Sequence, residues 1–126
     1  MAQVFITIAA IFGGVSVAAG AFGAHALRSK LSERSLEIFD TGSRYQMYHA
    51  LALLLVGLLM SRNPSPPTAL LASGWLFIIG VIIFSGSLYT LTLTNIKSLG
   101  AIAPLGGISL MIGWGALALA ASSLKF

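Results

Sequence analysis

The chain has 126 residues, of which 57% are hydrophobic and only 8% are charged, and its formal net charge at pH 7 is +4. Its mean hydropathy of +0.96 lies far above that of soluble domains, so the chain belongs in a membrane. The sequence contains no cysteine, which excludes disulfides, thiolate nucleophiles and cysteine ligands for zinc, haem or iron–sulfur clusters. The net charge does not call for a nucleic-acid partner, because membrane topology explains the few basic residues.

Apolar stretches divide the chain into four predicted spans. A bilayer core of about 30 Å needs about 20 helical residues for each crossing. Stretches of sufficient length cover about residues 4–27, 44–61, 68–93 and 99–124. The sequence therefore predicts an all-α integral membrane protein, a four-transmembrane-helix bundle that forms a single domain.

The first connection predicts a separate short helix. Leu36 and Phe39 lie three residues apart, and Leu31 and Ile38 lie seven apart, so an amphipathic helix between the first two spans can rest on the membrane surface. Ser43 begins an S-x-x-Q pattern, which is typical of a capping box at the start of a helix. The alternative is one continuous helix over about residues 32–61, bent near residues 41–42.

The start of the fourth span has two alternatives. If the helix begins near Leu99, Pro104 lies inside its first turns and bends it. If it begins at Pro104, about 20 residues are left, which is still enough to cross. The second alternative is slightly favoured, since proline suits the first turn of a helix.

Small residues recur at helical spacing on two of the predicted helices. The first helix carries one row of Ser16, Gly20 and Ala24 and a second row of Ala10, Gly14 and Ala18, and the fourth helix carries Gly106, Gly113, Ala116 and Ala120. In lipid, helices associate by close backbone approach at such residues. Two rows on one helix predict contacts on two sides, one within the bundle and the other with a second copy or another subunit.

Positive charges predict the orientation, because they favour the cytoplasmic side. The first and third connections hold Arg28, Lys30, Arg34, Arg44 and Lys97, whereas the other side holds Arg62 and Lys125. Both termini are therefore predicted to lie outside.

Polar residues collect in the cytoplasmic leaflet of this arrangement. The predicted polar cluster consists of His25, Tyr45, Gln46, His49, Ser85, Ser87, Tyr89 and Pro104. Tyr45 and Gln46 precede His49 by four and three residues, so they share a helix face with it. Because buried polar groups need partners, these side chains are expected to bond to one another or to backbone carbonyls.

Three interpretations of the polar cluster stay open. The first is structural, since interhelical polar bonds are by themselves a sufficient reason for it. In the second, His25 and His49 hold a haem or a metal, although two histidines make an incomplete metal set. In the third, the cluster relays a proton or binds a small solute, although no carboxylate lies within an apolar stretch. No cofactor is predicted.

Enzyme motifs are missing from the sequence. It has no G-x-S-x-G, H-E-x-x-H or phosphate-binding glycine loop, and its three acidic residues all lie in the first connection. The sequence therefore predicts no enzyme and no catalytic residues.

Several separated segments resemble one known family. They are GAFGAHAL (20–27), YQMYHALAL (45–53), FSGSLY (84–89) and PLGG (104–107) with Gly113-Trp114. Together they are similar to the domain of unknown function 423 family (DUF423, UPF0382), the YgdD-like small membrane proteins. The resemblance implies a four-helix protein of the bacterial inner membrane with no settled activity.

The function predicted from these features is that of an accessory, scaffold or assembly subunit of a larger membrane complex. Small size, two packing rows on one helix and the lack of a catalytic constellation favour it. The expected partners are the lipid bilayer and other membrane subunits or further copies. The alternative is a small-solute or proton-linked carrier that uses His25, Tyr45 and His49.

Overall fold

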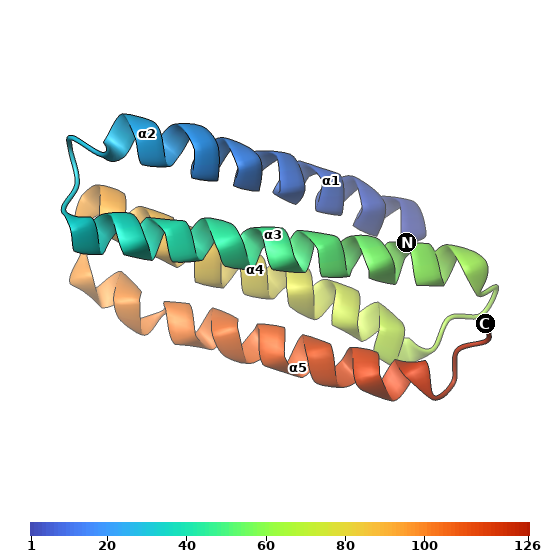
Figure 1. Ribbon diagram of the computed structural model, residues 1–126. Coiled ribbons are helices and arrows are strands. Elements are labelled where there is room, and N and C mark those ends of the chain that lie inside the picture. Colours follow the sequence, from blue (N-terminus) through green and yellow to red (C-terminus); the bar gives the residue numbers. More distant parts are fainter.

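The computed structural model describes residues 1–126, apart from the side chain of Ala24. Its helical elements in chain order are α1 (Ala2–Ala18), η1 (Ala19–Gly23), α2 (Ala24–Leu27), α3 (Glu33–Arg62), α4 (Thr68–Thr94), η2 (Lys97–Ala101) and α5 (Ala103–Ala121). The π-helical turn η1 joins α1 to α2 without a break, and η2 is a 3₁₀ helix that leads into α5. The long helices run antiparallel in an elongated bundle (Figure 1).

The helices are long and apolar enough for a membrane. By length and composition, three helical stretches of the described chain are able to cross a bilayer, namely Ala2–Leu27, Thr68–Thr94 and Lys97–Ala121. The helix α3 is not one of them, because charged residues extend along it to Arg44 and polar ones to His49. Its apolar part is therefore shorter than that of the others.

Residues 33–62 form one helix, which corrects two predictions. The prediction of a separate interfacial helix before the second span is wrong. The predicted helix start at Ser43 is also wrong, because Ser43 lies ten residues inside α3. The N-cap is Ser32, whose Oγ accepts a hydrogen bond from the backbone N–H of Ser35 at 3.2 Å. The alternative of a continuous helix is the one found.

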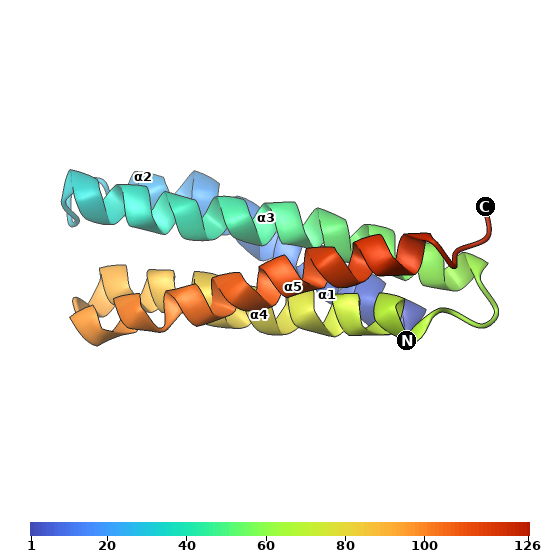
Figure 2. The same ribbon diagram turned by 90° about the horizontal axis from the view of Figure 1, so that it is seen from below.

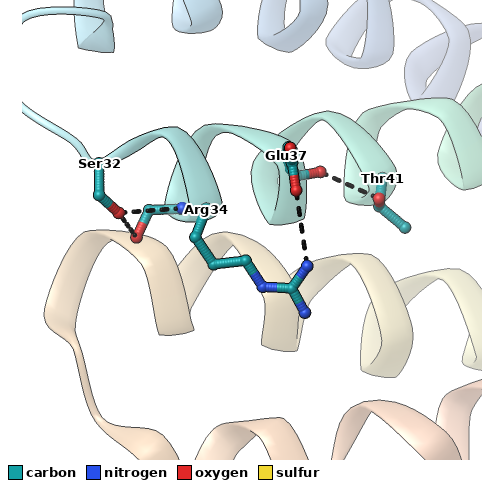
Figure 3. A network of polar contacts seen from close by, with 5 residues as sticks. Ser32, Arg34, Glu37 and Thr41 are labelled. Atoms are coloured by element: carbon teal, nitrogen blue, oxygen red, sulfur yellow. Dashed lines mark hydrogen bonds and ion pairs between the residues drawn. The ribbon is translucent and has the colours of Figure 1, made fainter.

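Local polar contacts allow the charged turns of α3 to stay helical beyond the apolar stretch. Figure 3 shows Arg34 beside Glu37, with 3.5 Å between guanidinium nitrogen and carboxylate oxygen, and Thr41, which donates to the carbonyl of Glu37 at 2.9 Å. One turn further, Arg44 lies 2.7 Å from the carboxylate of Asp40. Pairs at these spacings each stabilise a helix by a few tenths of a kcal/mol, ~0.2–0.5.

Proline and asparagine residues determine where α4 begins and ends and where α5 begins. Pro67 is the N-cap of α4, and Asn95 ends the helix in the left-handed conformation with φ 58°, which asparagine tolerates well. The helix α5 begins at Ala103, with Pro104 in its first turn. This is close to the favoured start at Pro104, and residues 97–101 form the separate η2.

Glycines let α4 and α5 approach closely. A Cβ on Gly106 would lie 2.4 Å from the backbone nitrogen of Phe84, and one on Gly80 would lie 2.5 Å from the side chain of Leu110. Either distance is far below a normal carbon contact, so only glycine fits at these two positions. The two helices are therefore held backbone to backbone, which is a main source of helix association in lipid.

The helices lie in the order α1, α3, α4, α5 across the bundle. Figures 1 and 2 show α1 and α5 on opposite sides of the α3 and α4 pair, with both chain termini at the same end as the connection between Arg62 and Thr68. The apolar core is centred on Phe5, Leu53, Val56, Leu70 and Phe77, which are each fully buried. At the opposite end lie the two connections that carry residues 28–32 and 95–102.

Candidate functional site

Gln46 bonds to two other helices with one side chain. Its Nε2 donates to the carbonyl of Phe12 on α1 at 2.9 Å, and its Oε1 accepts from the hydroxyl of Tyr89 on α4 at 2.8 Å. The residue is only 4% exposed. Because neither lipid nor the apolar core offers partners for an amide, these two bonds are what allow a glutamine to lie here.

Two serines make further hydrogen bonds between helices close to Gln46. Ser16 on α1 donates to the carbonyl of Ser43 at 2.5 Å, and Ser85 on α4 donates to the carbonyl of Gly42 at 2.7 Å. Both acceptors belong to adjacent residues of α3, so the same turn of α3 receives one bond from each side. The turn is buried, and Gly42 also packs against the ring of Tyr89.

His49 joins α3 to α5. Its Nδ1 lies 2.7 Å from the carbonyl oxygen of Tyr45, and its Nε2 lies 3.0 Å from the indole Nε1 of Trp114. A carbonyl only accepts and an indole N–H only donates, so Nδ1 carries the proton and Nε2 is the acceptor. The partners thus select one neutral tautomer and occupy both ring nitrogens.

An aromatic group surrounds His49. Its ring centroid lies 5.5 Å from that of Phe77 and 5.9 Å from that of Trp114, and the last two lie 5.2 Å apart at an angle of 62°. Tyr45 packs against Phe84 at 5.0 Å on the flank of the bundle. Edge-on aromatic packing of this kind contributes about 0.5–1.5 kcal/mol per pair beyond area burial.

Six side chains around Gln46 and His49 hydrogen-bond across helices, and we call them the polar seam: Ser16, Gln46, His49, Ser85, Tyr89 and Trp114. It runs from α1 through α3 and α4 to α5. Four of its members, Gln46, His49, Ser85 and Tyr89, belong to the predicted polar cluster. Separately, Ser109 on α5 donates to the carbonyl of Leu76 on α4 at 2.9 Å.

The other predicted cluster members lie elsewhere. His25 and Pro104 are exposed on the outside of the bundle, and Tyr45 is 42% exposed beside its helix neighbour Tyr48. Ser87 is buried, but it follows Gly80 by seven residues and so lies on the α4 face that packs against α5. The structure therefore does not bring His25 and His49 together.

Sequence reasoning missed two members of the polar seam: Ser16, which it predicts only as a packing residue, and Trp114. It also could not indicate the backbone acceptors. The sequence indicates Trp114 only as part of a family segment, because its role as a donor depends on the register between α3 and α5. The acceptors of Gln46, Ser16 and Ser85 are backbone carbonyls. Every residue has a carbonyl, so no side-chain pattern indicates which one is used.

The predicted packing residues lie at helix contacts. Ser16 and Gly20 face Ser43, where a Cβ on Gly20 would make an ordinary 3.8 Å contact, whereas Gly106 and Gly113 allow α5 to reach α4. The packing of Ala24 lies outside the described side chains. By contrast, the second row of α1, which consists of Ala10, Gly14 and Ala18, is exposed.

The polar groups of the seam are used for structural hydrogen bonds between helices. Each of Gln46, His49, Ser85 and Tyr89 has its main hydrogen-bonding atoms bound to another part of the chain. The lone pair at Nε2 of His49, which a metal or haem iron would need, is the one that accepts from Trp114. The polar seam is thus suited to fixing the register of the helices.

Long apolar helices joined by buried interhelical hydrogen bonds define a small helical membrane protein. The sequence profile of a family described as "Protein of unknown function (DUF423)" matches residues 19–107 of the chain, which include most of the polar seam. The chain belongs to this DUF423 family.

Curated relatives agree with that assignment. The chain is 44% identical over 126 residues to a UPF0382 membrane protein of Staphylococcus epidermidis, with 98% of each chain covered. It is 45% identical over 112 residues to the UPF0382 membrane protein YwdK of Bacillus subtilis, with 89% of this chain and 90% of the relative covered. No solved structure matches the chain at a significant level.

Proposed function

We propose that the protein is an accessory or assembly subunit of a larger membrane complex. The observation that carries this proposal is the outer face of α1. Ser16 and Gly20 of the first small-residue row pack against α3, whereas the second row, Ala10, Gly14 and Ala18, is exposed. A Cβ on Gly14 meets nothing within 4 Å, so a helix of another subunit can approach the backbone closely there.

The polar seam supports the same proposal. Its side chains are committed to bonds inside the bundle, which makes it a brace that keeps the helices in register. A bundle whose helices are held in register and which exposes a row of small residues is suited to lateral packing against other helices. The proposed role is therefore to hold or position a partner in the membrane.

The test uses Gly14→Leu, with Gly115→Leu as its matched control. A Cβ on either glycine meets nothing within 4 Å, but Gly14 lies on α1 and Gly115 on the outer side of α5. Tagged protein would be extracted gently from its own membrane and weighed by native mass spectrometry. We expect other membrane subunits to copurify with the unaltered chain and with Gly115→Leu, and to be lost with Gly14→Leu. A bare monomer in all three samples would overturn the proposal.

The carrier alternative has less support. It relied on His25, Tyr45 and His49 acting together, whereas His25 is exposed and His49 is bonded to Trp114. It stays a prediction that flux measurements in vesicles can test: a carrier would lose transport in His49→Ala while the bundle stays folded. A purely structural role for His49 would instead lower thermal stability.

We further propose four crossings of a bacterial cytoplasmic membrane, with both termini outside. Both termini lie at one end of the bundle, as an even number of crossings requires (Figure 1). The residues of the opposite end include Arg28, Lys30 and Lys97, and positive charge favours the cytoplasm. At about 1.5 Å per residue, the 30 residues of α3 are about 45 Å long, which exceeds the bilayer core of about 30 Å.

A further inference from the structure

A groove runs between α3 and α4 at the end of the bundle that carries most of the charge. Its outer part is a hollow of about 280 Å³ lined by Ser35, Ile38, Leu91, Thr92, Asn95 and Lys97. A second hollow of about 290 Å³ is lined by Arg34, Glu37, Ile38, Thr41, Phe84 and Leu88. Ile38 belongs to both linings, so the two hollows are neighbours.

The α4 side of the groove is one continuous apolar track. Phe84, Leu88 and Leu91 are spaced by four and three residues, so they lie along a single face of the helix. Asn95 continues this face by one more turn, where the helix ends. The groove therefore begins with polar groups and becomes apolar as it runs towards the middle of α4.

The depth of the groove matches the boundary of a bilayer. The 27 residues of α4 are about 40 Å long at about 1.5 Å each, against a hydrocarbon core of about 30 Å. A centred helix extends about 5 Å beyond the core at each end, which places Asn95 and Lys97 among the headgroups. Phe84, about 15 Å further along the helix, then lies about 10 Å inside the hydrocarbon.

The charges around the groove favour an anion. Lys97 is the one charged residue of the outer hollow. Two nearby carboxylates, on Glu37 and Asp40, are already paired with arginines (Figure 3 shows the first pair). Arg28 and Lys30, in the connection at the same end, add two further positive charges.

We propose that this groove binds one anionic phospholipid. The phosphate lies at Lys97, within reach of the polar side chains of Ser35 and Asn95, and one acyl chain lies along Leu91, Leu88 and Phe84. The combination of a cation at headgroup depth with an apolar track leading inward fits a lipid. A free phosphate has no acyl chain that could contact the track. This site is separate from the outer face of α1, so it does not depend on the proposed subunit role.

The test compares Lys97→Gln with Lys125→Gln in the full-length protein. Both variants lose one exposed lysine, but Lys125 lies at the other end of the bundle. Each protein would be placed in nanodiscs of equal parts phosphatidylglycerol and phosphatidylcholine, and the retained lipid counted by native mass spectrometry. We expect Lys97→Gln to retain about fivefold less phosphatidylglycerol, the factor that one basic residue at a membrane surface contributes. Lys125→Gln and Lys97→Arg should behave like the unaltered protein.

Three outcomes would overturn the proposal. An equal loss in Lys97→Gln and Lys125→Gln, or no loss in either, would mean that no lipid is held at this groove. Competition with excess glycerol phosphate distinguishes a site for a whole lipid from a site for the headgroup phosphate alone. Retention of phosphatidylglycerol in its presence supports a lipid site, whereas displacement would show a site for a free phosphate ester. A thermal melt of each variant checks that the bundle is folded.

Discussion

Gln46 is costly for a membrane bundle unless both ends of its amide are bound. Its partners come from α1 and α4, so one residue of α3 connects three helices. In bilayers such bonds contribute modestly, about 0.6 kcal/mol on average and up to about 1.7. Their larger effect is on register, because a shift of any of the three helices leaves a buried amide without a partner.

Tyr89→Phe should therefore destabilise the bundle. The substitution keeps the ring that packs on Gly42 and Phe39, but it leaves Oε1 of Gln46 without its donor. We expect a loss of about 1 kcal/mol in the free energy of unfolding, measured by denaturant titration in mild detergent. The control is Tyr48→Phe, since Tyr48 is 52% exposed on the same protein. Equal behaviour of the two variants would argue against the bond.

Trp114→Phe should have a similar effect through His49. Phenylalanine retains the edge contact with Phe77 but donates nothing to Nε2 of His49. A matched control is Trp75→Phe, because Trp75 is 41% exposed and packs edge-on against Phe5. The expected difference in unfolding free energy between the two variants is about 1 kcal/mol. If the control variant were the less stable one, the assigned role of Trp114 would be wrong.

At the scale of elements, Gly106 sets the distance between α4 and α5. The backbone of Phe84 occupies the space that a Cβ at this position would need, and a backbone cannot move aside by changing rotamer. Gly106→Ala must therefore push the helices apart, and overpacking of this kind costs about 1–3 kcal/mol.

Gly115→Ala is the control, because its added Cβ meets nothing within 4 Å. It should be neutral or slightly stabilising, by up to about 1 kcal/mol, since alanine has the higher helix propensity. The comparison is made by unfolding in sodium dodecyl sulfate, followed by circular dichroism. Equal tolerance of alanine at both positions would show that α4 and α5 are not in close backbone contact.

Hydropathy predicted the apolar elements better than it predicted α3. The third predicted span, residues 68–93, differs from α4 (Thr68–Thr94) by one residue, since proline and polar residues flank a long apolar run. For α3 the apolar run gives only the second half of the helix. The first half is held by the Ser32 cap and by side-chain pairs such as Arg34 with Glu37, and hydropathy does not report these contacts.

Spacing within a helix predicted part of the polar seam. Gln46 and His49 are three residues apart and both face inward, as expected for one side of a helix. His25 follows the π-helical turn η1, where the usual period of 3.6 residues no longer applies, and it ends up exposed. Contacts between helices, such as His49 with Trp114, depend on packing that no single helix encodes.

At the scale of the whole molecule, the proposed topology of four crossings predicts which residues a reagent can reach from each side of the membrane. The natural absence of cysteine allows single cysteines to be introduced at Ser29, Ser65, Ser98 and Ser123, which are all exposed. We expect an impermeant maleimide added to intact cells to label positions 65 and 123 but not 29 and 98. Labelling of position 29 together with 65 would mean that α3 does not cross the membrane.

The short connection between Arg62 and Thr68 divides the protein into two helical hairpins, α1 with α3 and α4 with α5. The bonds of Gln46 with Tyr89 and of His49 with Trp114 both join one hairpin to the other. We expect each hairpin to insert into a bilayer on its own and then to associate with the other through these groups. Fragments 1–63 and 64–126 expressed separately should therefore reconstitute the bundle. Without the tether, and its high effective concentration, loss of either bond should weaken reassembly far more than it weakens the intact chain.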